Sequence, residues 1–237
     1  MAQLVIGLGN HGGSYAHTRH NLGWMVLDEL ERRGRFGKER REGPARVCEG
    51  SVDGVELLLG RPQTYMNLSG RAGMHLTNRF NVSPADVIVV HDDLDLPSGR
   101  LRLRRGGSAG GNRGVQSLID SWRFKDFMRV RIGIGRPPED VDPVDYVLRR
   151  FTPEEKEVMA EAVPRAADAV LSIVRDGFDK AASIYNAVPK PPKPARSDRQ
   201  VPQEEDSSSR GGDLSSAESL DSSSSVSPPS PRDTSRG

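Results

Sequence analysis

Two polar side chains near the N-terminus could carry out acid–base chemistry. The imidazole of His20 has an ordinary pKa near neutral pH, so it can accept a proton and return it. The carboxamide of Asn10 can donate to a carbonyl and accept from a peptide N–H without carrying a charge. An apolar segment at residues 3–8 leads into a glycine-rich turn at residues 9–13, which contains Asn10, and His20 follows this turn. Because open α/β sheets bind ligands where their strands end, we expect a site there.

A carboxylate stands in a corresponding place later in the chain. Asp92 follows a β-branched run at residues 87–90, which is typical of a strand buried on both faces. An aspartate beside a histidine fixes the orientation of the imidazole ring and stabilises its protonated form. Since no serine or cysteine lies in a recognisable nucleophile motif, water is the expected attacker.

These residues also have plainer interpretations. His20 could cap a helix or lie in the core with its hydrogen bonds satisfied, and Asp92 could cap the next element. Asn67, which follows another predicted strand, could cap the helix that begins near residue 69. The acidic cluster at residues 91–95 could bind a metal ion, although one histidine with adjacent acids lacks a known ligand spacing. Residue types alone therefore do not separate catalysis from structure.

The glycines at residues 7–12 match the G-x-G-x-x-G pattern of dinucleotide-binding proteins. That pattern requires a second strand ending in an acidic residue about 20 residues later. Here the corresponding position falls at residues 30–33, in the polar end of a predicted helix. A tight turn between strand and helix is the alternative role for these glycines, and we expect no nucleotide cofactor.

The elements that would position these groups alternate along the sequence. Apolar residues recur at helical spacing in some segments and alternate with polar residues in others. We therefore predict one α/β domain over residues 1–187, in which a twisted, mixed and largely parallel sheet is flanked by helices. Predicted strands lie at residues 3–8, 45–52, 55–59, 87–90, 100–105 and 128–135, and predicted helices lie near residues 22–34, 69–80, 115–119 and 152–185.

Glycine and charge patterns predict where several of these segments end. Gly34 should end the first helix, because glycine is common just beyond a helix C-terminus. The charged residues 35–44 should then form a loop, and the glycine-rich residues 106–114 should form a flexible loop. Two surface loops are therefore expected beside the predicted strands.

The last predicted helix has the strongest start signal. The sequence T-P-E-E at residues 152–155 combines a capping threonine, a proline in the first turn and a capping-box glutamate. The helical pattern continues to about residue 185. It should be broken near Pro164 and near Gly177, because both residue types interrupt helices.

The composition indicates a soluble, cytoplasmic protein. Charged residues make up 28% of the 237 residues, and no apolar run approaches the ~18 residues of a membrane span. No basic stretch followed by a long apolar one stands at the N-terminus, so no secretory signal is expected. Cys48 is the only cysteine, which excludes an internal disulfide and a cysteine-rich zinc site. Residues 188–237 are rich in proline and serine and should form a disordered tail.

The formal net charge of +1 does not mark the chain as a nucleic-acid binder. The balance hardly changes when residues 188–237 are set aside, so any contact with nucleic acid must come from a local patch. Arginines alternate with leucines along the predicted strand at residues 100–105. They could form a solvated face or a set of phosphate contacts beside the glycine-rich loop. These arginines are Arg100, Arg102, Arg104 and Arg105.

Five motifs, in order and with matching spacing, resemble those of bacterial peptidyl-tRNA hydrolases. Within residues 1–187 they read G-L-G-N-x-G-x-x-Y-x-x-T-R-H-N, T-Y-M-N-L-S-G, H-D-D-L-D-L-P-x-G, G-G-x-x-G and R-I-G-I-G-R-P. No single motif would suffice, but the co-linear set is specific. The resemblance implies a monomeric α/β enzyme that hydrolyses the ester between a peptide and the ribose of tRNA without a metal ion or other cofactor.

The same resemblance implies roles for individual residues. His20 would be the general base for water, and Asp92 would polarise it. Asn10 would read the peptide bond of the substrate, which distinguishes peptidyl-tRNA from free aminoacyl-tRNA. Further residues would contact the 3′ end of the tRNA or the peptide, with Met66 lining the cleft. These further residues are Tyr15, Tyr65 and Asn67.

Two positions depart from the family pattern. His11 stands where the family usually has proline, which loosens the turn without removing a catalytic group. The second departure is Asn112-Arg113-Gly114, where the family has His-Asn-Gly. The tRNA-binding asparagine of the family thus aligns with Arg113. Either Asn112 takes over its contact through a small shift of the loop, or Arg113 contacts a phosphate instead.

The altered loop and the long tail also motivate a different hypothesis. A relative on the same fold could have lost catalysis and bind RNA as a processing or splicing partner. The presence of Asn10, His20, Asn67 and Asp92 argues against it, because loss of catalysis would remove the need for that set.

Overall fold

β1 (Gln3–Gly7) lies in the middle of an eight-stranded sheet in the computed structural model, which describes residues 2–187. It pairs in parallel with β5 (Val55–Pro62) on one side and with β6 (Ile88–Asp93) on the other. Beyond β6, β8 (Met128–Gly133) adds a further parallel strand. β7 (Leu101–Arg105) completes this side as an antiparallel edge strand. The parallel strands therefore end at one common edge.

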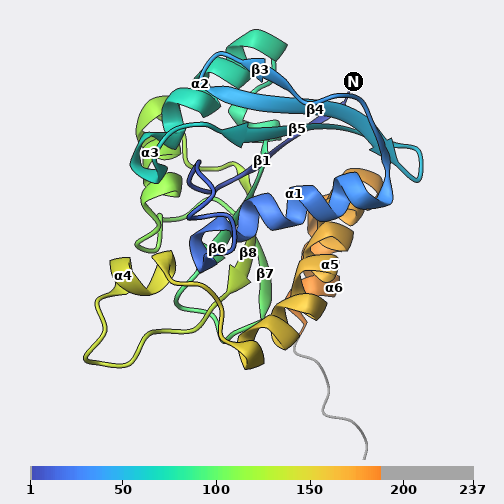
Figure 1. The fold of residues 1–237 in the computed structure, drawn as a ribbon. Coiled ribbons are helices and arrows are strands. Elements are labelled where there is room, and N and C mark those ends of the chain that lie inside the picture. The colour runs from blue at the N-terminus through green and yellow to red at the C-terminus, as the bar shows by residue number, and fades with distance from the viewer. Residues whose placement is uncertain (1, 188–237) are drawn as a thin grey trace, which may run out of the picture. The chain divides into compact units, whose positions relative to one another are not determined.

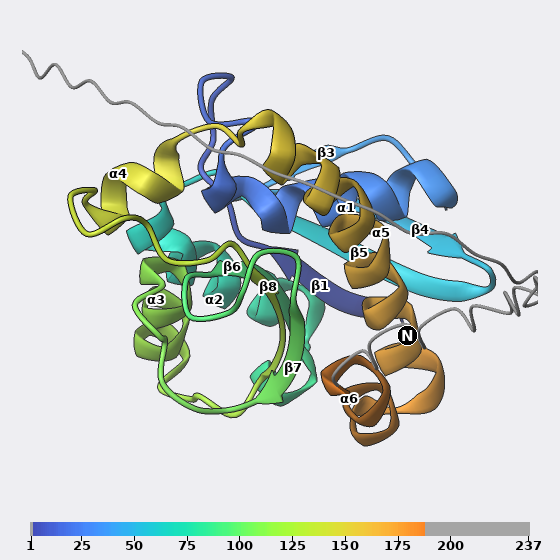
Figure 2. The same ribbon diagram turned by 90° about the horizontal axis from the view of Figure 1, so that it is seen from below.

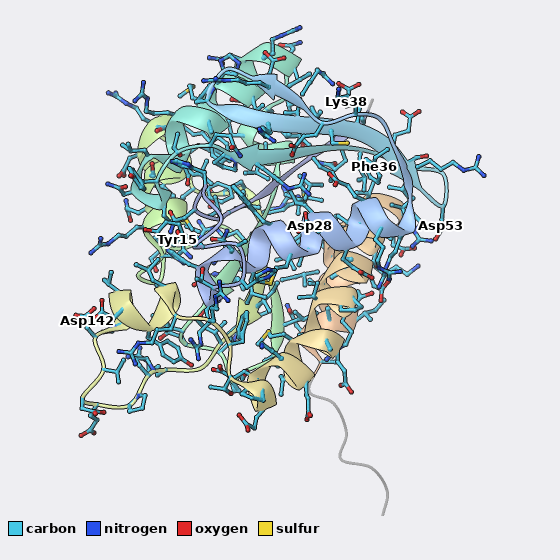
Figure 3. The ribbon with its side chains drawn as sticks, viewed as in Figure 1. Tyr15, Asp28, Phe36, Lys38, Asp53 and Asp142 are labelled. Carbon is cyan, nitrogen blue, oxygen red and sulfur yellow. The ribbon has the colours of Figure 1, made fainter. Side chains whose placement is uncertain are left out.

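The other half of the sheet is antiparallel. β4 (Ala45–Val52) pairs with β5 through a tight turn at residues 53–54, where both residues have positive φ and Figure 3 labels Asp53. Residues 35–44, predicted as a loop, instead form β2 (Arg35–Phe36) and β3 (Arg40–Glu42), which both pair with β4. That prediction was wrong because the pairing depends on a distant strand edge, which the local charge does not reveal. The strand order is β2-β4-β5-β1-β6-β8-β7, with β3 also on β4.

Helices cover both faces of the sheet (Figures 1 and 2). α1 (Leu22–Arg33), α5 (Pro153–Asp176) and α6 (Phe178–Asn186) contribute to one hydrophobic core. α2 (Ser69–Phe80) and α3 (Arg113–Trp122) contribute to the other. The predicted α/β class, with a mixed sheet flanked by helices, is confirmed. The predicted disordered tail at residues 188–237 lies outside the described residues.

Alternation along β1 explains how one strand serves two cores. Val5 packs in the core that contains Val26 of α1, whereas Leu4 and Ile6 pack in the core that contains Leu76 of α2. All three β1 residues are fully buried. Because successive side chains of a strand point to opposite faces, a continuous apolar strand needs cover on both sides.

α5 runs unbroken through Pro164, so the break predicted there was wrong. Proline removes one helical hydrogen bond, but buried small residues on this helix, such as Ala166 and Ala169, pack it against the sheet. The second predicted break is confirmed at Gly177, whose φ of 87° ends the helix. The predicted capping box at Thr152 and Glu155 is also present. Of these three signals, only the one at Pro164 was overridden by tertiary packing.

Several short helices were not predicted, and two of them begin at a recognisable cap. α4 (Pro143–Leu148) begins at Asp142, whose side chain accepts a hydrogen bond from the backbone N–H of Val144 at 2.7 Å. The 3₁₀ turn η3 (Pro84–Asp86) is capped similarly by Ser83. In both, a capping residue followed by proline was a readable start signal. Among residues 2–187, no helix is both long and apolar enough to cross a bilayer.

The close approach of α1 to β1 generates the first prediction. A Cβ at Gly23 would clash with the backbone of both Leu8 and Val90. We expect Gly23→Ala to lower the free energy of unfolding by about 1–3 kcal/mol, as overpacking does, measured by urea denaturation. Gly37→Ala is the control, because a Cβ there has its nearest neighbour at 3.6 Å. Equal stability of both variants would show that there is room for a methyl group between Gly23 and its neighbours.

Candidate active site

A cavity of about 250 Å³ opens where β1, β5 and β6 end. One wall is formed by α4, which contributes Val144, Val147 and Leu148. Figure 3 labels Tyr15 and also Asp142, which caps the N-terminus of α4, and both lie on the left of that view. Every side chain that the sequence singled out for the site lines the cavity: Asn10, Tyr15, His20, Tyr65, Met66, Asn67, Asp92, Asn112 and Arg113.

His20 and Asp92 form a buried pair at the base of this cavity. His20 lies in the 3₁₀ turn η1 (Arg19–Asn21), directly before α1. Its Nδ1 lies 2.9 Å and 3.0 Å from the two carboxylate oxygens of Asp92. Since a carboxylate only accepts, Nδ1 carries the proton and Nε2 keeps its lone pair. Among the described residues nothing hydrogen-bonds Nε2, which suits a general base.

Opposing effects set the protonation of this pair. Burial lowers the pKa of His20, but the charge of Asp92 and the hydrogen bond to it raise that pKa, and the net value lies above the ordinary 6.5. The positive charge of Arg113 opposes the increase. Burial raises the pKa of Asp92, but its attraction to His20 outweighs burial and holds that pKa below the ordinary 3.8. Each partner thus favours the charged form of the other.

These pKa shifts make the stability of the fold depend on pH. The raised pKa of His20 stabilises the fold at pH values below 6.5, and this contribution is lost as the pH rises through the pKa in the folded state. The lowered pKa of Asp92 stabilises the fold above 3.8, and this contribution is lost as the pH falls through its folded-state value. The charged pair is therefore most stabilising in the acidic to neutral range.

Asn10 has a fixed orientation that leaves its Nδ2 group for the cavity. Its Oδ1 accepts from the backbone N–H of Met66 at 2.9 Å. Asn21 clamps its main chain, since Oδ1 of Asn21 accepts from the N–H of Asn10 at 2.9 Å and Nδ2 donates to its carbonyl at 3.0 Å. The Nδ2 group of Asn10 is thereby free to donate to a ligand. Asn21 belongs to the T-R-H-N string, but no local signal in the sequence predicts this role.

Arg19 connects the turn that carries His20 to the α4 wall, and sequence reasoning missed it. Its guanidinium donates to the carbonyls of Tyr146, Arg149 and Arg150 at 3.1–3.2 Å and pairs with the carboxylate of Glu155. It also lies 4.1 Å from the ring centroid of Tyr146. Because these partners lie more than 120 residues later, no local pattern could reveal them.

Exposed side chains form the rim of the cavity. Met66 begins the 3₁₀ turn η2 (Met66–Leu68) and is buried, whereas Tyr65 before it is 60% exposed and Asn67 after it is exposed. The rings of His11 and Tyr65 lie 5.5 Å apart. Asn67 does not cap α2, because the cap position belongs to Leu68 and no side chain caps that helix. The capping interpretation of Asn67 is therefore wrong.

The glycine-rich loop ends at Asn112, which caps α3, so Arg113 and Gly114 belong to the helix instead. Asn112 is 8% exposed, whereas Arg113 is exposed. The backbone of the loop is anchored by Arg129, which donates to the carbonyls of Gly107 and Ser108 at 3.0 Å and 2.7 Å. Its glycines with positive φ are Gly106, Gly107, Gly110 and Gly111.

Only part of the predicted arginine set borders the glycine loop. Arg104 lines a cavity of about 90 Å³ beside the loop, together with Arg129 and Arg131. Burial and the charges of Arg104 and Arg131 lower the pKa of Arg129 to about 10. Arg100 instead donates to the carbonyls of residues 186 and 187. The arginines beside the loop therefore come from two strands, β7 and β8.

The acidic cluster at residues 91–95 is occupied by internal contacts. His91 donates to the carbonyl of Asp92 at 2.7 Å. Asp93 pairs with Arg131, and Asp95 pairs with Arg136. Within residues 2–187, no group of three or more histidine, cysteine or acidic side chains has the arrangement to hold a metal ion.

The chain resembles known proteins over most of its length. The profile of a family described as peptidyl-tRNA hydrolase matches residues 4–194. A peptidyl-tRNA hydrolase of Roseiflexus sp. (strain RS-1) is 45% identical over 207 residues, which cover 87% of this chain and 94% of the relative. One from Nocardia farcinica is 46% identical over 180 residues, covering 75% and 93%. The crystal structure of peptidyl-tRNA hydrolase from Acinetobacter baumannii matches with a TM-score of 0.73 and 30% identity, covering 78% and 95%.

The buried pair predicts a specific titration. In an NMR titration of the imidazole, His20 should show a pKa above 6.5. Asp92→Asn should bring it below that value, because burial persists while the attracting charge is removed. Asp95→Asn removes a charge from the same segment but not from His20, so it should leave the titration unchanged. A pKa of His20 that does not respond to Asp92→Asn would contradict the pairing.

Proposed function

The chain belongs to the peptidyl-tRNA hydrolase family, and from this premise we propose how its cleft cleaves the ester between peptide and tRNA. Nε2 of His20 takes a proton from water while the water oxygen attacks the acyl carbon. The ester C–O bond then breaks, and the proton returns to the departing ribose oxygen. The peptide leaves with a free carboxyl group and the tRNA with a free hydroxyl. One observation carries this scheme: Nδ1 of His20 is held by Asp92 within a cavity that the carboxamides of Asn10 and Asn67 also line.

We assign the recognition of the peptide to the carboxamides. Nδ2 of Asn10 has the free N–H groups that a substrate carbonyl needs, since Oδ1 is held by Met66. Asn67, which lies in η2 directly after Met66, supplies a second carboxamide that lines the cavity. Neutral groups suit a peptide bond, because they can pair with it without the desolvation cost of a charge. An unblocked aminoacyl-tRNA lacks this peptide bond and should fit poorly.

We assign the 3′ end of the tRNA to the aromatic rim. Tyr65 is 60% exposed beside the cavity, and Tyr15 lines it from the turn after β1. Exposed aromatic rings offer faces on which single-stranded bases stack, worth about 1–3 kcal/mol per base. The terminal nucleotide can then lie over the rim while its ester reaches His20.

We assign the backbone phosphates of the acceptor stem to the arginines around the glycine loop. Of the two loop residues considered for this contact, Arg113 is favoured, because it is exposed and has no ion pair or hydrogen bond from its side chain within residues 2–187. The side chain of Asn112 is already occupied by internal hydrogen bonds. Arg104, likewise without an ion pair in the described part of the chain, borders the other side of the loop.

We further propose that the protein acts as a monomer in the cytoplasm. The free edge of β7 is blocked by Asn186, whose side chain accepts from the N–H of Leu103 at 2.7 Å and donates to its carbonyl at 2.9 Å. A blocked edge prevents strand pairing with a second copy. The cytoplasmic location rests on the substrate, since peptidyl-tRNA arises at the ribosome.

The first test of this proposal compares two substrates. N-acetyl-aminoacyl-tRNA should be hydrolysed rapidly and unblocked aminoacyl-tRNA slowly, because only the first offers an amide to Asn10. His20→Ala should reduce turnover by about 100-fold or more, as loss of a general base does, while tRNA binding persists. His17→Ala, which alters an exposed histidine nearby, is the control. Near-normal turnover by His20→Ala would exclude this base, and tight RNA binding without turnover by the wild type would support the non-catalytic hypothesis.

The second test concerns the phosphate contact of Arg113. Arg113→Ala should weaken tRNA binding and reduce the slope of log K against log salt by about 0.7–0.9, the value for one phosphate contact. Arg113→Lys should retain most of the slope, because it retains the charge. Arg175→Ala, which removes an exposed charge at the end of α5, should change neither quantity. An unchanged slope in Arg113→Ala would place the contact elsewhere.

A further inference from the structure

We propose that Asn112 is a positioning residue for catalysis, which acts on His20 through Asp92 and makes no contact with the substrate. This inference rests on the proposed function, because it concerns the strength of the same base. It assigns to the end of the glycine loop a part in the chemistry as well as in tRNA binding.

The side chain of Asn112 has no hydrogen-bonding capacity left for a ligand. Its Oδ1 accepts from the backbone N–H groups of Gly114 and Val115 at 3.0 Å and 3.1 Å. This bonding fixes which end of the carboxamide is oxygen. Its Nδ2 therefore faces Asp92 and donates to the carboxylate Oδ1 at 3.1 Å and to the main-chain carbonyl at 3.3 Å. Two acceptor sites and two donor hydrogens are all engaged.

The carboxylate of Asp92 depends on this donor. Its side chain is 3% exposed, so few of its lone pairs can be satisfied by water. Among the described residues, His20 and Asn112 are the two side chains that hydrogen-bond its oxygens. A carboxylate buried with fewer donors holds its negative charge less stably and attracts a neighbouring imidazolium more strongly. Asn112 thus stabilises the anion and moderates its pull on His20.

The neutrality of Asn112 matters as much as its hydrogen bond. A basic side chain at this place would compensate the charge of Asp92 and weaken the base, whereas an acidic one would add to that charge and keep His20 protonated. The neighbouring cation, Arg113, instead faces the cavity, where its charge opposes protonation of His20. The two adjacent residues therefore both favour the neutral imidazole that can accept a proton from water.

The anchor of Asn112 connects both halves of the catalytic site. A Cβ at Gly114 would clash with Met66, so the first turn of α3 lies directly against that residue. The N–H of Met66 in turn donates to Oδ1 of Asn10. The contacts of Asn112 and of the first turn of α3 thus fix the positions of Asp92 and Asn10 relative to each other. This continuity explains why a helix cap is placed beside a catalytic carboxylate.

Two substitutions separate the role of the cap from the contact with Asp92. Serine and aspartate are both good N-caps, so Asn112→Ser and Asn112→Asp should preserve α3, which thermal unfolding will check. Serine is too short to reach Asp92, and aspartate replaces the donor with a charge. The pH profile of kcat/KM for N-acetyl-aminoacyl-tRNA has an acidic limb that reports the pKa of the base. This apparent pKa should rise by about half a unit in Asn112→Ser and by about one unit or more in Asn112→Asp.

Substitutions at Asn78 serve as controls for those at Asn112. Asn78→Ser and Asn78→Asp make the same changes at an exposed position of α2 and should leave the limb unchanged. A raised KM with an unmoved limb would mean that Asn112 binds substrate, and would overturn the inference. NMR titration of His20 in the same variants gives the expected order without any substrate. If the wild type showed no turnover, the proposed function would fail while this titration still decided the role of Asn112.

Discussion

The buried carboxylate of Asp92 is the constraint on which the site depends. Removing a charge from water costs several kcal/mol unless the charge is paired and hydrogen-bonded, and this side chain is 3% exposed. β6 must therefore end where a histidine and a carboxamide can meet it. His20 comes from the turn before α1 and Asn112 from the cap of α3. The close approach of Gly23 to Leu8 lets α1, and with it His20, lie near enough.

Three asparagines perform most of the orientation around this charge. Asn21 holds the main chain of Asn10, Asn10 holds Met66, and Asn112 holds Asp92. Each uses both ends of its carboxamide or leaves one defined end free. Because the amides are neutral, they fix geometry without adding a second charge to a buried region. Within residues 2–187, Nε2 of His20 and Nδ2 of Asn10 have no hydrogen-bond partner, so they are the groups that the proposed mechanism directs at the substrate.

The sequence predicted the elements and the residues whose signals are local. Strand ends and a β-branched run marked His20 and Asp92 as candidates, and the motif resemblance supplied their roles and added the rim. Features that depend on distant partners were not predictable in this way. β2 and β3 pair with an edge that the local charges do not reveal. Arg19 binds carbonyls in the segment from residue 146 to residue 150, and Pro164 is tolerated because of packing along α5.

The charge balance of the chain conceals how its arginines are used. Arg19 and Arg61 are consumed by internal ion pairs with glutamates and aspartates. Around the glycine loop the situation differs, because Arg104, Arg113 and Arg129 have no ion pair within residues 2–187. A net charge near zero is thus compatible with arginines beside the loop that have no ion pair in the described part of the chain, and such local charge can attract a polyanion. Which arginines lack an acidic neighbour therefore says more about where a polyanion can bind than the total charge does.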